Sequence, residues 1–175
     1  TSRVFFNSGY VQNVEEIGRI CRSEGVLFLL DDYQGCGQLP IDVSKTMVDI
    51  LLTGGLKWLL GGPGISYMYV NKDIVDRLNP VVTGWFAHKH QFEFDPYEMV
   101  FKDDARRLEN GTPSISAVYS AKAGIELVNK IGVEAIYQRT NRLTLALVSA
   151  LIDADFSLRI PDVSSEHASI TCIRS

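Results

Sequence analysis

A lysine and an aspartate follow hydrophobic segments of this sequence, and the pair could do chemistry together. Lys57 lies in a glycine-rich turn that begins at Gly54-Gly55 and is followed by Trp58-Leu59-Leu60. Apolar neighbours that exclude water favour the neutral amine, which can attack a carbonyl group and form a Schiff base. Asp31 directly follows the apolar run Val26–Leu30. Taken singly, Lys57 could equally pack its stem on a tryptophan, and Asp31 could be a turn residue.

Together, Lys57 and Asp31 match the needs of one cofactor. Pyridoxal phosphate requires a lysine amine, a carboxylate beside its pyridinium nitrogen and hydrogen-bond donors for its phosphate. Lys57 and Asp31 supply the first two. The sequence therefore predicts a site for pyridoxal 5'-phosphate, with a small amino compound as substrate.

Three motifs in a fixed order extend this hypothesis to a family. They are Asp31-Asp32-Tyr33-Gln34, then Gly54-Gly55-Leu56-Lys57-Trp58-Leu59-Leu60-Gly61-Gly62-Pro63-Gly64, then Glu109-Asn110-Gly111-Thr112-Pro113. This D-x-x-Q, lysine and G-T-P series resembles the class V aminotransferases, which belong to fold type I of the pyridoxal-phosphate enzymes. The resemblance covers nearly the whole chain.

The resemblance implies a role for each motif residue. Asp31 would pair with the pyridine nitrogen, Gln34 would hydrogen-bond the phenolic oxygen, and Lys57 would form the internal aldimine and then move the proton at the substrate Cα. Thr112 would reach the phosphate of a cofactor held by a neighbouring subunit, so a homodimer with shared active sites is expected. The D-x-x-Q spacing selects Asp31 and leaves Asp32 as a turn residue.

The resemblance also concerns the phosphate and the reaction. Gly54 stands where many members have a phosphate-binding serine, so we expect Thr53 or backbone N–H groups to take its place. The segment Gly84-Trp85-Phe86-Ala87-His88 resembles the kynureninases, in which a tryptophan here helps to hold the phosphate. Leu56 departs from the tyrosine of kynureninases and from the histidine of many desulfurases. An aminotransferase, a kynureninase-like hydrolase and a cysteine-desulfurase-like lyase all stay open.

Composition excludes several other classes of function. The 175 residues carry 17 Lys and Arg against 21 Asp and Glu, a net charge of −4, which gives no electrostatic reason to expect nucleic acid. Three widely spaced cysteines without a C-x-x-C pair favour a reducing, cytoplasmic compartment. No apolar run reaches the ~18 residues of a membrane span. His88 and His90 would lie on one face of a strand but have no third ligand near in sequence, so no metal site is expected.

An α/β fold is predicted to position the motifs. Continuous apolar runs are typical of parallel strands, and helical spacing separates the first two runs. We expect a mostly parallel sheet with flanking helices, part of the fold type I large domain. Ligands bind at the carboxyl ends of such strands. The expected strands are 4–7, 26–30, 48–52 and, antiparallel after a glycine turn, 65–70; the expected helices are 14–21 and 43–47.

The second half of the chain predicts helices and the start of another unit. The aromatic, irregular stretch 80–110 is interpreted as a long functional loop. Helices are expected over 116–130 and 134–151, with Gly132 as the C-cap between them and Thr112 as the N-cap of the first. Two short strands are expected over 156–160 and 170–173.

These elements predict a division of the chain. We expect a partial pyridoxal-phosphate-binding large domain over residues 1–130, a linking helix over 131–153, and a truncated beginning of a C-terminal small domain over 154–175. The sequence does not begin with methionine, and its last unit does not close. The hypothesis is therefore a truncated enzyme with little turnover of its own.

Overall fold

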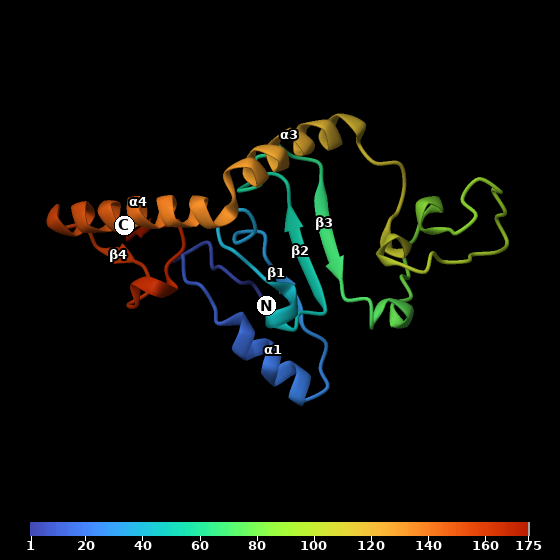
Figure 1. Ribbon diagram of the computed structural model, residues 1–175, viewed down its shortest axis with the longest axis horizontal. Helices are drawn as coiled ribbons and strands as arrows, with labels where there is room; N and C mark the ends of the chain where they lie inside the picture. The colour runs from blue at the N-terminus through green and yellow to red at the C-terminus, as the bar shows by residue number, and fades with distance from the viewer. Residues whose placement is uncertain (175) are drawn as a thin grey trace.

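A three-stranded mixed sheet forms the centre of the protein, whose computed structural model describes residues 1–174 (Figure 1). Strand β1 (Leu29–Asp31) pairs in parallel with β2 (Ile50–Gly54), which pairs antiparallel with β3 (Ser66–Val70). The α/β fold and the antiparallel direction of β3 are confirmed. Strand β1 begins three residues later than predicted, β2 has the predicted length but begins two residues later, and β3 begins one residue later, because only residues within hydrogen-bonding reach of a neighbour continue the ladder.

The predicted strand over residues 4–7 is wrong, because the chain turns there. The N–H of Gly9, at a φ of 72°, donates to the carbonyl of Phe5 at 2.8 Å. The extended segment lies earlier: Asp31 N–H donates to Thr1 O at 2.8 Å, and Arg3 N–H donates to Asp31 O at 2.9 Å. Residues 1–3 therefore run parallel to β1.

Two helices cover one side of the sheet; one precedes β1 in the chain and the other precedes β2. Helix α1 (Val14–Ser23) begins after Asn13, whose side chain accepts from the N–H of Glu16. Helix α2 (Val43–Thr46) begins after Asp42, which caps it in the same way. The α1 helix packs a hydrophobic core against β1 and β2, made of Val14, Phe28, Leu30, Val48 and Leu51.

The long helices α3 (Ile115–Ile131) and α4 (Val133–Asp153) meet at Gly132, which has a φ of 86° and ends α3 as predicted. Helix α3 crosses the end of the sheet where β2 stops (Figure 1). A Cβ at Gly124 would lie 2.3 Å from the carbonyl oxygen of Leu59, so α3 touches the turn after β2 through a residue without a side chain. The N-cap of α3 is Ser114, so the predicted cap at Thr112 is wrong.

The C-terminal segment returns to the N-terminal one after α4. Strands β4 (Leu158–Arg159) and β5 (Cys172–Ile173) lie within the two strands expected here and pair antiparallel, with the 3-10 turn η4 (Ser164–Glu166) between them. The N–H of Ala168 donates to Gly9 O at 2.8 Å, and the N–H of Val11 donates to Glu166 O at 2.7 Å. These bonds hold the segment beside residues 9–11.

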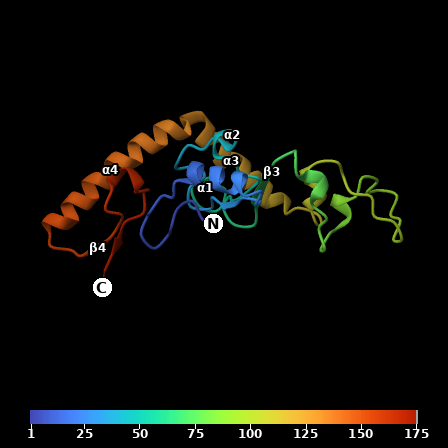
Figure 2. The same cartoon turned by 90° about the horizontal axis from the view of Figure 1, so that it is seen from below.

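The irregular stretch after β3 lies at the opposite end of the molecule from α4 (Figures 1 and 2). It contains three short 3-10 turns, η1 (Val75–Arg77), η2 (Trp85–Ala87) and η3 (Ala105–Leu108). Buried Arg107 of η3 donates to the carbonyl of Val75 at 2.9 Å, which joins η3 to η1. Within residues 1–174, no helix has both the length and the apolar character that crossing a membrane requires.

Candidate functional site

The carboxyl ends of β1 and β2 carry most of the residues singled out from the sequence. Asp31 is the last residue of β1 and pairs in register with Leu52 of β2. Gln34 lies in the turn after β1, Thr53 and Gly54 end β2, and Lys57 lies in the turn that follows. The parallel pairing of the two strands therefore brings an amine, a carboxylate and an amide to one edge of the sheet.

Lys57 is exposed, so the expectation that Trp58 and its apolar neighbours would desolvate it is wrong. Its Nζ lies 4.9 Å from the ring centroid of Tyr33, a cation–π contact. Trp58 itself turns toward Gln34, and its indole N–H donates to Gln34 Oε1 at 3.4 Å. The ammonium is therefore held by an aromatic face from the segment after β1.

Gly54 is buried under the ring of Tyr33. A Cβ at position 54 would lie 2.2 Å from Tyr33 Cε2 and 2.5 Å from the Tyr33 hydroxyl. Such distances are far inside van der Waals contact, so a serine side chain has no room here while Tyr33 keeps its place. The hydroxyl of neighbouring Thr53 is buried and donates to the carbonyl of Asp32 at 3.4 Å.

Asp31 presents an exposed carboxylate at the end of β1. It accepts hydrogen bonds from the N–H of Tyr33 at 2.9 Å and from the hydroxyl of Ser2 at 3.3 Å. Both partners are neutral donors. The carboxylate is therefore held in place and is accessible to a cationic group.

Asp32 begins the turn after β1, as predicted, since its carbonyl accepts from the N–H groups of Gly35 at 3.1 Å and Cys36 at 2.9 Å, but its side chain is fully buried. Its Oδ2 pairs with the guanidinium of Arg3 at 3.3 Å, while its Oδ1 has no hydrogen-bond partner among the described residues. Burial raises the pKa of the Asp32 carboxyl to about 6, and the charge and hydrogen bond of Arg3 offset part of that rise. The alternation of a strand could have revealed it, since Asp32 shares the inward face of fully buried Leu30.

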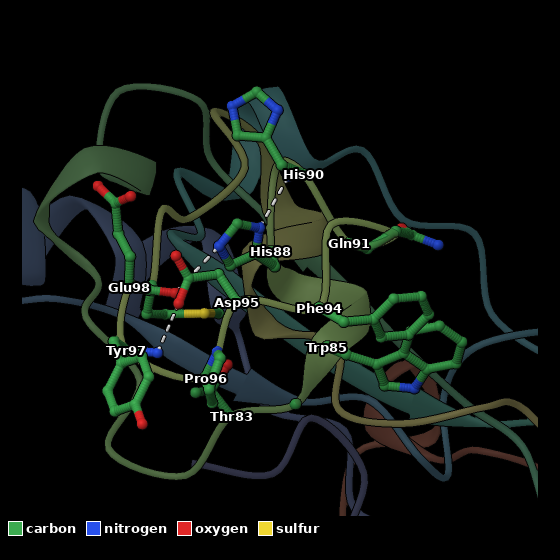
Figure 3. A pocket seen from close by; sticks show the side chains of 12 residues that line it. Thr83, Trp85, His88, His90, Gln91, Phe94, Asp95, Pro96, Tyr97 and Glu98 are labelled. Atoms are coloured by element: carbon green, nitrogen blue, oxygen red, sulfur yellow. Dashed lines mark hydrogen bonds between the residues drawn. The ribbon is translucent and has the colours of Figure 1, made fainter.

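The other two candidates lie apart from this edge. Trp85 lies in η2, which follows β3 in the chain, with its ring edge-on to Phe86 and stacked with Phe94 at centroid distances of 4.9 and 5.8 Å (Figure 3). Thr112 is exposed in the segment that leads into α3. Among the described residues, the ring contacts of Trp85 do not reach Lys57.

The histidines near Trp85 border a groove of about 320 Å³ (Figure 3). His88 forms a single bridge with Phe101, so the strand expected to carry His88 and His90 is absent from this described segment. Both ring nitrogens of His88 are engaged: Nδ1 accepts from His90 N–H at 2.8 Å, and Nε2 lies 3.2 Å from the carbonyl of Glu98. Within residues 1–174, no three His, Cys, Asp or Glu side chains are grouped to hold a metal ion.

Comparison with known proteins gives the family. The model of the family described as "Aminotransferase class-V" matches residues 5–175. This chain belongs to the class V aminotransferase family. The class V aminotransferases and the related cysteine desulfurases depend on pyridoxal phosphate.

Curated relatives of this class V chain carry two kinds of name. The "Uncharacterized aminotransferase YcbU" of Bacillus subtilis (strain 168) is 41% identical over 133 residues, 76% of this chain and 35% of that protein. A "Probable cysteine desulfurase" of Pyrococcus abyssi (strain GE5 / Orsay) is 29% identical over 162 residues, 93% of this chain and 40% of that protein. The chain thus spans between about a third and two fifths of the length of these relatives.

Solved structures agree with the class V fold. An apo cysteine desulfurase from Thermococcus onnurineus NA1 superimposes on 99% of this chain with a TM-score of 0.89 and 25% identity, and 43% of that chain is covered. The cysteine desulfurase CsdA from Escherichia coli gives a TM-score of 0.84 at 18% identity, a likeness of fold alone. The chain therefore has part of the fold of type I pyridoxal-phosphate enzymes, as predicted.

The donor set at the sheet edge fits this cofactor. An aldehyde needs an accessible primary amine, which exposed Lys57 provides, and a ring nitrogen needs a carboxylate, which exposed Asp31 provides. The residues are compatible in type and accessibility with the cofactor of the class V family.

Proposed function

We propose that the protein is a pyridoxal-phosphate-dependent enzyme that acts on a small amino compound, with Lys57 as the residue that binds the cofactor covalently. The observation that carries the proposal is the meeting of Lys57, Asp31 and Gln34 where β1 and β2 end. An amine, a carboxylate and an amide are the three groups that this cofactor uses along its ring.

Each of these side chains has a task in the proposed enzyme. Pyridoxal phosphate bound here would supply an electron-withdrawing ring, which would allow a bond to the amino-bearing carbon of the substrate to break. Asp31 keeps the ring nitrogen protonated through its negative charge. Gln34 donates a hydrogen bond to the phenolic oxygen. Lys57 would hold the cofactor and would also take and return a proton at the substrate Cα as general base and acid.

Phosphate binding is proposed to involve residues of two subunits. Thr53 and Gly54 end β2 just before the lysine turn, and we propose that they supply donors from the same chain, the Thr53 hydroxyl by turning away from the Asp32 carbonyl to which it donates at 3.4 Å. Trp85 and Thr112 are both exposed, so a second copy of this chain could contact them. We propose a C₂ homodimer in which these two residues complete the partner's site. Light scattering is expected to give a dimer, and a monomer at every concentration with cofactor bound would contradict this arrangement.

The domain division is proposed as well. Residues 1–130 form part of the large domain, residues 131–153 form the linking helix, and residues 154–175 begin the small domain. The continuous helix α4 and the separate β4–β5 pair support this division. The last residue, Ser175, lies outside the described residues.

The reaction is proposed to be amino-group transfer, with a desulfurase-like lyase as the second candidate. The name of the 41% identical relative supports the first, while the Pyrococcus relative and the Thermococcus structure support the second. The kynureninase-like feature around Trp85 stays a prediction. A panel of amino donors with 2-oxo acids, run beside cysteine with sulfide detection, separates the two candidates.

The attachment residue is tested by trapping. Borohydride reduction of the protein loaded with pyridoxal phosphate, followed by peptide mapping, is expected to label Lys57. Lys45, next to the end of α2, and Lys72, after β3, are the internal controls. A label on either of these instead of Lys57 would overturn the assignment.

A further inference from the structure

Two aromatic contacts cross between the segment after β1 and the turn after β2. Tyr33 stands next to Gln34 in sequence, yet its ring contacts Lys57 at 4.9 Å from centroid to Nζ. Trp58 stands next to Lys57, yet its indole N–H donates to Gln34 Oε1 at 3.4 Å. Lys57 is therefore held by Tyr33, the sequence neighbour of Gln34, and Gln34 is held by Trp58, the sequence neighbour of Lys57.

Two glycines make room for this crossed pair. Gly54, at the end of β2, lies so close to the Tyr33 ring that an added Cβ would be 2.2 Å from it. Gly37, in the segment after β1, lies so close to Trp58 that an added Cβ would be 2.7 Å from the Trp58 carbonyl oxygen. Gly37 also has a φ of 95°, which an L side chain rarely adopts. Each aromatic residue thus sits against a glycine of the opposite segment.

The Trp58 contact decides which end of the Gln34 amide is available. An indole N–H is a donor only, so it pairs with the amide oxygen and not with the amide nitrogen. The NH₂ group of Gln34 is then left to face a ligand. This NH₂ group can donate a hydrogen bond to a negatively charged ligand oxygen such as a phenolate oxygen.

The Tyr33 contact acts on the amine. A cation over an aromatic face gains on the order of 0.5–1 kcal/mol at an exposed site, so the ring of Tyr33 restrains the position of the Lys57 amine and covers one side of it. Since Lys57 is exposed, the ring of Tyr33 supplies a restraint that burial does not.

We propose that Tyr33 and Trp58 form one crossed clasp of positioning residues, in which Tyr33 holds the Lys57 amine and Trp58 orients the Gln34 amide. The part that concerns Lys57 is a property of the chain itself. The part that concerns the ligand of Gln34 rests on the proposed function.

The first test uses protein without cofactor. Trinitrobenzenesulfonate, an amine-selective reagent, is applied at a fixed pH, and the labelling rates of Lys57, Lys45 and Lys72 are measured by peptide mapping. Tyr33→Leu is expected to speed labelling of Lys57 by about two- to five-fold, because the amine loses the ring that restrains and covers it. Tyr33→Phe keeps the ring and is expected to match the unmodified protein.

The controls separate this effect from a loss of fold. Partial unfolding in Tyr33→Leu would speed labelling at Lys45 and Lys72 as well, so the rate at Lys57 is divided by the rates at these two lysines, and a ratio equal to that of the unmodified protein would overturn the Tyr33 half of the clasp. Lys57 labelling that is equal in the unmodified protein and a folded Tyr33→Leu would overturn the Tyr33 half of the clasp. So would a Tyr33→Phe variant that behaves like Tyr33→Leu.

The second test reads the Gln34 amide through the absorption spectrum of the bound cofactor. Trp58→Phe removes the indole N–H and frees the amide to rotate, so a phenolate loses a fixed donor. The midpoint of the spectral pH titration is expected to move upward by about one pH unit or less. Tyr33→Phe is the matched aromatic control and should leave the midpoint in place.

The outcomes distinguish this inference from the proposed function. An unmoved midpoint in Trp58→Phe, with cofactor bound at Lys57, would overturn the Trp58 half of the clasp. Failure of borohydride to trap pyridoxal phosphate on Lys57 would overturn the proposed function and with it the ligand assigned to Gln34. The conclusion from labelling, that Tyr33 restrains Lys57, would remain valid in that case, because that experiment uses protein without cofactor.

Discussion

The side-chain oxygen of Gln38 accepts a hydrogen bond from the backbone N–H of Ser169 at 3.0 Å, across 131 positions of sequence. The amide nitrogen of the same fully buried side chain donates to the carbonyl of Gln34. Gln38 therefore ties the segment that carries Gln34 to the segment between β4 and β5.

Replacement of Gln38 by methionine is expected to lower the free energy of unfolding by about 1–3 kcal/mol. The change keeps the length of the side chain but leaves the half-buried N–H of Ser169 and the half-buried carbonyl of Gln34 without these partners. Urea denaturation measures the loss. Gln138→Met on exposed α4 is the control and should change stability by less than about 0.5 kcal/mol. Equal effects of the two variants would contradict this account of Gln38.

Asp32 is expected to make stability fall as pH rises. Burial raises the pKa of its carboxyl from 3.8 to about 6 in the folded protein. Because the folded pKa lies above the unfolded one, the stabilising contribution of the protonated group is complete below about pH 4 and is lost as pH rises through 6. The loss attributable to Asp32 is up to about 3 kcal/mol by pH 7.

The difference between the unmodified protein and Asp32→Asn isolates this effect. Hydrogen bonds from Ser44 and Arg106 lower the pKa of Asp42 and Asp104, which gives the opposite pH trend, but these groups are common to both proteins and cancel. Urea unfolding is measured at intervals from about pH 4 to 7. A difference that does not vary with pH would show that Asp32 does not titrate in this range.

Gly54→Ala is expected to destabilise the protein by about 1–3 kcal/mol, because the new methyl group overlaps the Tyr33 ring. In a background of Tyr33→Ala the same change should cost much less, since the ring is gone. A double-mutant cycle by urea denaturation gives the coupling between the two positions. Additive effects would mean that the two residues are not in contact.

Asp31→Asn is expected to reduce turnover of the proposed enzyme by about 10²–10³-fold, as for removal of one charge-stabilising group from an active site. Its unfolding free energy should change by less than about 0.5 kcal/mol, because the carboxylate is exposed. Asp32→Asn should do the opposite: its free energy of unfolding should change more than that of Asp31→Asn, and its turnover should change less. If turnover depended on Asp32 and not on Asp31, the D-x-x-Q register would be wrong by one residue.

Local signals in the sequence were sufficient to predict much of the fold. The apolar runs before Asp31 and Gly54 indicated β1 and β2, and the Gly61–Gly64 turn indicated the direction of β3. Gly132 marked the end of α3 because a positive φ at a helix end favours glycine. These features depend on residues close together in the chain.

Features that depend on distant residues were not predictable in the same way. Val4 is buried against Leu39 and Ala168, so its apolar character came from a cluster and not from a strand. The burial of Asp32 required Arg3 to come alongside β1. The contacts of Tyr33 with Lys57 depend on two turns meeting in space, and no periodicity or motif records that meeting.

The tie between Gln38 and Ser169 bears on the order in which the protein folds. The hydrogen bond of Trp58 to Gln34 spans 24 positions, whereas that of Ser169 to Gln38 spans 131. Closing the longer loop costs more entropy, and contacts distant in sequence slow folding. The ribosome also completes Asp31 and Lys57 well before it reaches Ser169. We therefore expect the lysine edge of the sheet to take shape co-translationally and the C-terminal segment to dock last, so a nascent chain stalled near residue 130 should already protect the amides of β1 and β2 from hydrogen exchange.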